Sequence, residues 1–314
     1  MVINFKLLGK IAIQRFKMLK NIDNQIESKI KHTKTIAISG ASGFVGQNLT
    51  LYLERKNYRV LKISRDILTN PAVLDEIIKS SDVIINLNGA NIINRWSESY
   101  KKILISSRID ATKNLAHSIN RVSKKPKLFI STSAIGIYDN KKTYDENGSF
   151  ANDFLSTLCQ NWEAEAKKAK SEFVKVAIFR FGIALAKDGG AFKKMITPFK
   201  LGLGGVIGSG EQHFSFIHIE DLLNAYLFVI ENSFDGAFNL VSPTPTTNYE
   251  FTKTLGKVLN RPTFFTVPEF VLKLIFSEGA KVLSDGESAV PKKLLDLGFE
   301  FKYKDIKECL QSLL

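Results

Sequence analysis

The feature that most constrains the fold is a turn with three glycines, Gly40-x-x-Gly43-x-x-Gly46, between a short apolar segment and an amphipathic one. In such a turn the first glycine allows a sharp change of direction. The second lets the backbone approach a diphosphate, and the third lets the helix pack closely on the strand. The first backbone amides of a helix lack partners and attract anions. The spacing therefore predicts a strand over 35–39, a helix over 44–55 and an anionic ligand at the turn.

The chain then alternates apolar segments of strand length with amphipathic segments of helix length. Further strands are predicted over 58–64, 82–87, 127–132 and 174–181, and further helices over 72–79, 97–121 and 153–169. Strands joined by helices of this length form a parallel sheet with right-handed crossovers and helices on both faces. The predicted fold class is therefore α/β, with a doubly wound, Rossmann-type parallel sheet.

Three parts are predicted along the chain. A dinucleotide-binding domain spans 34–184, with later returns near 214–242, and residues 185–314 are mostly a smaller, substrate-side C-terminal subdomain. The second part has glycine-rich segments over 201–210 and several prolines, which are typical of loops that close over a cleft. Residues 1–33, which precede the dinucleotide-binding domain, are interpreted as a flexible basic extension. A membrane-surface helix and a targeting segment are the alternatives.

The formal net charge of +13 raises the question of nucleic-acid binding. Residues 1–34 hold eight basic side chains against two acidic ones, and the remaining excess forms no basic stripe interleaved with aromatic residues. The chain has two cysteines, and they lack the spacing of metal ligands. We therefore expect a reducing, cytoplasmic location, with neither a disulfide nor a metal site. No window approaches the roughly 18 apolar residues of a membrane span. We expect a small-molecule substrate, no nucleic acid and no stable membrane insertion; a homodimer is left open.

The end of the second predicted strand bears on the choice of cofactor. A site for NAD usually has Asp or Glu there, which accepts a hydrogen bond from the ribose 2′-hydroxyl. Ser64 and Arg65 hold that position here, and a hydroxyl beside a guanidinium suits a 2′-phosphate. In the alternative, Arg65 is a solvated loop residue and Asp66 binds the ribose. The sequence therefore favours NADP over NAD.

Motifs along the whole chain resemble the extended short-chain dehydrogenase/reductase superfamily, and more specifically its atypical "epimerase family" branch. Besides the glycine turn they are Asn86-Leu87-Asn88-Gly89-Ala90, Ser131-Thr132-Ser133-Ala134, Arg95-Trp96, Ser107-Arg108-Ile109-Asp110, Leu158-Cys159 with Trp162-Glu163, Arg180 with Gly182-Ile183, Gly208-Ser209-Gly210, Phe216-Ile217-His218 with Asp221, and the block from Pro291 to Tyr303. They cover about residues 35–314, and the last block is specific to this branch, which has its own small C-terminal domain.

The glycine turn and this resemblance together imply a set of residues that bind the cofactor. The expected residues are Gly40, Ser42, Gly43, Phe44, Val45, Gly46, Ser64, Arg65, Leu87, Asn88, Gly89, Arg108, Ser131, Phe181, Gly182 and Ile183. For Arg108, which lies in the segment predicted as a long helix, a solvated or paired arginine is the alternative.

Enzymes of this superfamily usually carry a Tyr and a Lys four residues apart on the helix after the fourth strand. One helix face then brings the ammonium close to the phenol and lowers its pKa, so that the phenol can exchange a proton with the substrate. The helix predicted over 153–169 has no tyrosine, and Leu155 and Cys159 fall near the expected places. The usual acid/base pair is therefore missing.

Two residues remain as candidates for catalysis, Ser133 and Tyr138. Tyr138 lies just past the fourth strand, where substrates of open α/β sheets bind. Lys142 has the right spacing from Tyr138, but the segment between them has a loop composition, in which four residues do not share one face. Ser133 is expected to hydrogen-bond a reacting oxygen, as its counterpart does in the superfamily; the alternative is a strand-end hydroxyl that satisfies the backbone.

Other chemically capable side chains have simpler interpretations. An acid in the first turn of a helix favours the helix dipole, a histidine beside it braces a loop, and a thiol without a histidine nearby in sequence is inert. Tryptophans in helical surroundings pack. Structural roles are therefore expected for Asp221, His218, Cys159, Trp96 and Trp162.

Two functions are compatible with these observations. The first is an NADP-dependent oxidoreductase or epimerase-like enzyme that acts on an unidentified small polar metabolite, such as a nucleotide sugar or a carbonyl compound. Hydride transfer is then the chemistry of the cofactor, and the protein orients the substrate and handles the proton. The second is a non-catalytic NADP-binding or redox-sensing protein that has lost the Tyr/Lys pair.

Overall fold

A computed structural model describes residues 34–314, so the predicted N-terminal extension lies outside the described residues. The first half contains β1 (Thr35–Ser39), α2 (Phe44–Arg55), β2 (Arg59–Ile63), α3 (Arg65–Leu68), α4 (Pro71–Lys79), β3 (Val83–Asn86), α5 (Glu98–Ser106), α6 (Ile109–Arg121), β4 (Leu128–Ala134), η1 (Ile135–Ile137), β5 (Thr143–Tyr144), α7 (Phe154–Lys167), β6 (Lys175–Phe181) and β7 (Ile183–Ala186). The second half contains α8 (Gly190–Lys200), β8 (Gly205–Ile207), β9 (Phe216–His218), α9 (Ile219–Asn232), β10 (Gly236–Leu240), α10 (Asn248–Leu259), β11 (Phe265–Val267), α11 (Glu269–Phe276), η2 (Ser277–Ala280), α12 (Lys281–Ser284), β12 (Ser288–Ala289), α13 (Lys292–Asp296) and α14 (Ile306–Leu313).

The central sheet has six strands in the order β10-β6-β4-β3-β1-β2, and every neighbouring pair is parallel. All residues of β1 and β3 are buried, as expected for strands with a helical layer on each face. The strand order reverses between β1 and β3, and ligands of such sheets bind at the carboxyl ends of the strands near that point. The predicted fold class, a doubly wound parallel sheet, is confirmed.

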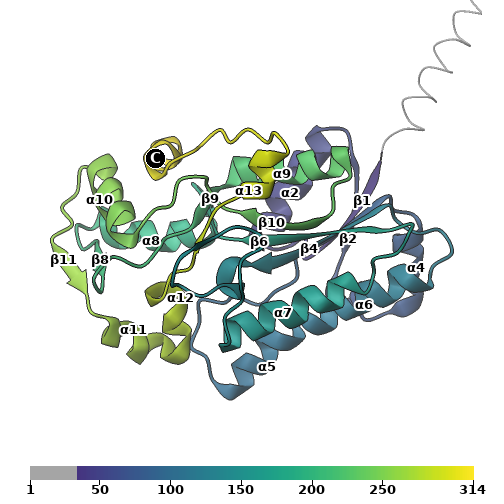
Figure 1. Cartoon of the computed structure of the whole chain (residues 1–314), viewed down its shortest axis with the longest axis horizontal. Coiled ribbons are helices and arrows are strands. Elements are labelled where there is room, and N and C mark those ends of the chain that lie inside the picture. The colour runs from purple at the N-terminus through teal and green to yellow at the C-terminus, as the bar shows by residue number, and fades with distance from the viewer. Residues whose placement is uncertain (1–33) are drawn as a thin grey trace, which may run out of the picture.

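Two helical layers cover the sheet (Figure 1). On one face α2 and α9 pack against it through buried side chains that include Leu49, Leu53 and Tyr226. On the other face α4, α6 and α7 do so through Leu74, Leu115 and others. β10 and α9 come from the second half of the chain, so this segment joins the sheet that the first half begins.

A second, smaller core lies beside the sheet, toward the end of the molecule that carries α8 and α10 in Figure 1. Aromatic and aliphatic side chains of α8, α10 and α14 form it, together with Phe214 and Phe216. No helix among the described residues is long and apolar enough to cross a membrane. This core holds the segments that border the carboxyl ends of β4 and β6.

The prediction of one long helix over 97–121 is wrong, because two helices, α5 and α6, occupy this range. The break falls at Ser107 and Arg108. Ser107 Oγ accepts a hydrogen bond from the amide of Ala90, and Arg108 Nη2 donates one to the Ala90 carbonyl. These contacts with the loop after β3 hold the chain at the break. Ser107 and Arg108 are both compatible with the interior of a helix, so the sequence did not indicate the break.

Candidate functional site

The glycine turn after β1 is packed too tightly for side chains. Gly40 has a φ of +80°, and a Cβ there would lie 2.7 Å from the carbonyl carbon of Leu87. A Cβ on Gly46 would overlap the carbonyl oxygen of Gly40, so α2 starts directly against the turn. Only glycine fits at both positions. The sharp turn and the close packing of helix on strand that the spacing predicts are therefore present.

Gly43 leaves the start of α2 open. It is the N-cap residue, it is exposed, and no side chain caps the first amides of the helix. A Cβ on Gly43 would have the carbonyl oxygen of Gly40 at 3.3 Å as its one neighbour within 4 Å. Phe44, the first residue of α2, packs on the backbone of Gly189 and Gly190 at the start of α8. The amides of the first turn are therefore free to bind an anion.

Ser64 and Arg65 lie next to this turn. Ser39 at the end of β1 is paired with Ile63 at the end of β2, so the two residues that follow Ile63 lie beside the turn. Both are exposed, and the Arg65 guanidinium forms no ion pair among residues 34–314. Ser64 Oγ accepts a hydrogen bond from the Ile67 amide at 3.4 Å as the cap of α3. Asp66 is also exposed, within the first turn of α3.

A cavity of about 300 Å³ lies at the carboxyl ends of β4 and β6. Five predicted site residues line it: Arg108, Ser133, Phe181, Gly182 and Ile183. Apolar side chains of α7 form one wall, and the segment around Glu287, from the C-terminal part of the chain, forms another. The structure therefore brings together at one cavity residues from both halves of the sequence.

Ser133 is anchored by a buried ion pair. Its Oγ lies 2.9 Å from Glu163 Oε1, to which it donates a hydrogen bond. Glu163 also accepts two hydrogen bonds from the Arg180 guanidinium, at 2.7 and 2.9 Å, and both charged groups are almost completely buried. Because its single proton points to Glu163, the Ser133 hydroxyl presents lone pairs to a ligand in the cavity.

Tyr138 does not line this cavity. Its ring is 1% exposed, its hydroxyl donates to Asn239 Oδ1 at 2.9 Å, and it accepts from Arg180 Nη1 at 2.6 Å. Burial raises the pKa of the phenol. Lys142 lies over the ring of Tyr144 instead, at 5.2 Å. The catalytic role expected for Tyr138 is therefore not supported by its position, and a structural role fits the contacts.

Replacing Tyr138 by Phe tests this structural role. The change leaves Asn239 Oδ1 and one Arg180 N–H without their buried partner, and such a loss costs about 1–3 kcal/mol. We expect urea denaturation to report a free energy of unfolding lower by that amount. The exposed Tyr249→Phe variant is the control and should change little. Equal stabilities of the two variants would contradict the network.

No acid/base pair exists on α7. Leu155 lines the cavity with an aliphatic side chain, and Cys159 is buried, which raises the pKa of its thiol to about 12. Trp162 Nε1 donates to Thr112 Oγ1 at 2.8 Å, although one edge of the ring reaches the cavity. The thiol is buried, as expected, and the two places of the usual Tyr and Lys hold an aliphatic side chain and a thiol of raised pKa.

Arg108 is held in the cavity wall. Its guanidinium donates to the carbonyls of Leu104 and Ala90, at 3.2 and 2.9 Å, and lies over the Trp162 ring at 5.3 Å. Burial lowers the pKa of this group. No carboxylate pairs with it among residues 34–314. The guanidinium is therefore held by main-chain carbonyls, and a half-buried cation without a carboxylate partner in this part of the chain lines the cavity.

The remaining predicted residues lie around the turn or beneath it. Leu87, Asn88 and Gly89 follow β3, and Asn88 Nδ2 donates to Ser39 Oγ at 2.5 Å. Ser131 is completely buried in β4, where its hydroxyl accepts from Asn86 Nδ2 at 3.1 Å. Ser131 thus supports the end of β3 from within the sheet and does not face a ligand.

The structural roles expected for two groups near α9 are confirmed. His218 is the N-cap of α9, and its Nδ1 accepts a hydrogen bond from the Glu220 amide at 3.0 Å. Asp221 is buried and accepts hydrogen bonds from the amides of Lys302 and Tyr303, at 2.8 and 3.0 Å. His218 Nε2 also lies 3.2 Å from Ser312 Oγ of α14, so both residues attach the C-terminal segment to the start of α9.

Two cavity residues were missed by sequence reasoning, His213 and Glu287. His213 Nδ1 is buried and has no hydrogen-bond partner within the part of the chain that the structure describes. Burial, with smaller contributions from Asp153 and Asp285, raises the pKa of Glu287 to about 7. Neither residue lies in a recognisable motif with the other site residues, so only the fold shows that they share a cavity.

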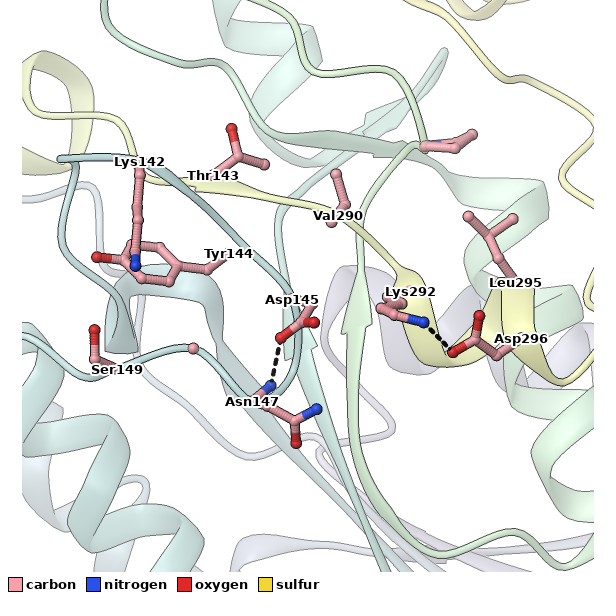
Figure 2. A pocket seen from close by; sticks show the side chains of 12 residues that line it. Lys142, Thr143, Tyr144, Asp145, Asn147, Ser149, Val290, Lys292, Leu295 and Asp296 are labelled. Carbon is pink, nitrogen blue, oxygen red and sulfur yellow. Dashed lines mark hydrogen bonds and ion pairs between the residues drawn. The ribbon is translucent and has the colours of Figure 1, made fainter.

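A larger and more open hollow of about 670 Å³ lies elsewhere, between the loop around β5 and the start of α13. Figure 2 shows its charged groups: Lys292 points to Asp296, with 2.5 Å between Nζ and Oδ2, and Asp145 accepts a hydrogen bond from the Asn147 amide. No predicted site residue lines it. Within residues 34–314 no cluster of His, Cys, Asp or Glu has the arrangement of a metal site. The smaller cavity is therefore the candidate site.

Family models match two parts of the chain. The model described as the NAD dependent epimerase/dehydratase family matches residues 36–240, and a domain of unknown function, DUF1731, matches residues 267–313. The chain is 36% identical to the "Epimerase family protein SDR39U1" of Mus musculus over 290 residues, which cover 88% of this chain and 99% of that protein. It is 35% identical to the chloroplastic SDR39U1 homolog of Arabidopsis thaliana, covering 89% of this chain and 86% of that protein.

Solved structures agree with these matches. A crystal structure of human epimerase family protein SDR39U1 (isoform2) with NADPH is similar with a TM-score of 0.83 and 31% identity. The similarity covers 89% of this chain and 98% of the human one. A dTDP-4-dehydrorhamnose reductase from Bacillus anthracis, crystallised with NADP, has a TM-score of 0.73 at 19% identity, over 90% and 98% of the two chains. This second similarity shows the fold alone.

Proposed function

Because this chain belongs to the NAD dependent epimerase/dehydratase family, we propose that it is an NADP-dependent oxidoreductase acting on a small carbonyl or hydroxyl compound. The glycine turn carries the proposal: Gly40 and Gly46 exclude side chains, and Gly43 leaves the first amides of α2 open. These groups would hold the diphosphate of NADP. The NADPH in the human relative of 31% identity supports this assignment.

The cavity at the carboxyl ends of β4 and β6 is the proposed place of reaction. Bound NADP supplies or accepts a hydride there. Phe181, Gly182 and Ile183 would border the nicotinamide end of the site. The Ser133 hydroxyl, whose proton is donated to Glu163, would accept a hydrogen bond from the hydroxyl of an alcohol substrate or product. At about 300 Å³ the cavity is at the lower end of the roughly 300–1,000 Å³ of small-molecule pockets. This size and the mostly apolar lining favour a small carbonyl or hydroxyl compound over a nucleotide sugar.

A turnover assay with purified full-length protein tests the proposal. NADPH oxidation is followed by absorbance with a panel of aldehydes, ketones, 2-oxo acids and nucleotide sugars, and NADP reduction is followed with the matching alcohols. We expect turnover of at least one small carbonyl compound. Tight NADPH binding without turnover of any member of the panel would contradict an oxidoreductase and favour a sensor.

Arg65 tests the preference for NADP. Its guanidinium is proposed to bind the 2′-phosphate, which NADH lacks, and charge-assisted hydrogen bonds of this kind contribute about 1.5–3 kcal/mol. Arg65→Ala should therefore weaken NADPH binding about tenfold or more and leave NADH binding within about twofold. Fluorescence titration measures both, with the exposed Lys62→Ala of β2 as the matched control. Equal losses for NADPH and NADH would place the 2′-phosphate elsewhere.

A second function, a non-catalytic NADP-binding or redox-sensing protein, is favoured by one observation. Leu155 and a thiol of high pKa, Cys159, stand near the places where related enzymes carry Tyr and Lys. A sensor needs the cofactor site and not the acid/base pair. The turnover assay above separates the two functions. A cytoplasmic location and a homodimer remain predictions, to be checked by fractionation of cells and by light scattering.

A further inference from the structure

The cavity contains a carboxyl group, that of Glu287, close to η1 and to the first turn of α7. Gly136 of η1 lies next to both residues. A Cβ at Gly136 would lie 3.7 Å from Glu287 Oε1 and 3.8 Å from Leu155 Cβ. The carboxyl of Glu287 and the start of the Leu155 side chain thus converge on one point above η1. Leu155 is the residue of α7 near the expected place of the tyrosine. The C-terminal domain therefore brings a titratable group to the place that α7 leaves apolar.

The position of Glu287 is fixed by its neighbours. Its carbonyl accepts a hydrogen bond from Ser215 Oγ at 2.8 Å, and the next two residues form β12, which pairs with β5. Gly286 has a φ of +50° and packs on the backbone of His213, where a Cβ would not fit. The backbone on both sides of Glu287 is therefore held, as a catalytic side chain requires.

We propose that Glu287 is the general acid and base of this site, and that it replaces the phenol of the usual pair. The proposal rests on the proposed oxidoreductase function. In the direction of reduction, the O–H bond of the Glu287 carboxylic acid breaks as the substrate oxygen gains its proton. The carbonyl carbon gains a hydride from NADPH, which is oxidised to NADP⁺. In the reverse direction the carboxylate takes the proton of the substrate hydroxyl.

The surroundings of Glu287 suit this exchange. The charged and titratable groups around it are Asp153 at the start of α7, Asp285 on its own segment, His213 beside Gly286, and Arg108 and Cys159 in the cavity lining. Burial raises the pKa of Glu287 to about 7, and the two aspartates act in the same direction. A group that titrates near the working pH is half protonated and serves both directions of proton transfer.

Glu287→Gln tests the proposal, with the exposed Glu278→Gln of η2 as the matched control. The amide keeps the shape and removes the exchangeable carboxyl proton. We expect at least a hundredfold loss of kcat on any carbonyl compound that the wild-type protein reduces, since general acid/base catalysis contributes about 10²–10⁴-fold. Calorimetric NADPH affinity should stay within about twofold, which shows that the cofactor site is intact.

A second readout does not depend on turnover. Infrared difference spectra of the full-length protein between pH 5 and pH 9 should contain a carboxylic acid band that disappears near pH 7. This band should be absent from Glu287→Gln and present in Glu278→Gln. Addition of NADPH together with a non-reducible alcohol analogue should shift its midpoint, because the ligand then hydrogen-bonds the carboxyl.

Each other result has a defined meaning. Undiminished kcat in Glu287→Gln overturns the acid/base role and leaves the proposed function intact. If the titrating band is still present in Glu287→Gln, the acid/base role is overturned as well. Failure of the wild-type protein to bind NADPH overturns the proposed function and, with it, the role of Glu287.

Discussion

Gly43→Glu should abolish NADPH binding, with a loss of affinity of at least about a hundredfold, or roughly 3 kcal/mol. The new carboxylate would lie at the open start of α2, where the diphosphate is proposed to bind, and would both fill the space and repel the anion. The fold should tolerate it, because Gly43 is exposed with a φ of −72° and its Cβ has one neighbour at 3.3 Å.

Calorimetry with the purified variant measures this effect, and circular dichroism checks the fold. Leu51→Glu is the control. Leu51 is exposed on the same helix, about two helical turns after Gly43, so this substitution adds the same charge away from the glycine turn. We expect the control to bind NADPH like the wild type. Equal binding by Gly43→Glu and the wild type would mean that the diphosphate does not contact the start of α2.

Arg180→Met should lower the free energy of unfolding by about 3–5 kcal/mol, the usual cost of removing one partner of a buried ion pair. Arg180 is 3% exposed and Glu163 is 2% exposed, with 2.7 Å between Nε and Oε1. Without the guanidinium, the Glu163 carboxylate remains buried next to Ser133, and its one remaining counterion among the described residues is the more exposed Lys167, whose Nζ lies 3.4 Å from Oε2. Arg180 also holds the hydroxyl of Tyr138 and the carbonyl of Glu146, which lose their donor.

Urea denaturation monitored by fluorescence measures this loss. The matched control is Arg121→Met, which removes a guanidinium from a pair with Asp75 at the surface, where Arg121 is half exposed. Exposed pairs contribute about 0.2–1 kcal/mol, so the control should stay near the wild type. If the two variants lose the same amount, the Glu163 carboxylate must be protonated, solvated or neutralised by Lys167 in the folded variant.

The local part of the fold could be predicted because it depends on neighbours in sequence. The glycine turn, β1 and α2 have the predicted bounds, since spacing of apolar residues and glycines determines them. The break between α5 and α6 was missed because it depends on Arg108 and Ser107 contacting Ala90, some 18 residues away. A contact at that separation leaves no periodic signal.

The candidate site divides in the same way. Gly182 and Ser133 could be identified because each lies directly at the end of a strand that the sequence predicts. Tyr138 lies just past a strand end too, but its ring turns inward to Arg180 and Asn239. Glu287 reaches the cavity only through the pairing of β12 with β5, which joins segments about 145 residues apart. Such a pairing follows from the tertiary structure alone.

The central claim is that the start of α2 and the cavity at the ends of β4 and β6 together hold NADP. A crystal structure of the full-length protein grown with NADPH tests this most directly. We predict density for the diphosphate on the amides that follow Gly43, for the 2′-phosphate beside Arg65, and for the nicotinamide ring in the cavity with Ser133 and Glu287. Density for the dinucleotide in the open hollow beside Lys292, or with its diphosphate away from α2, would contradict the account.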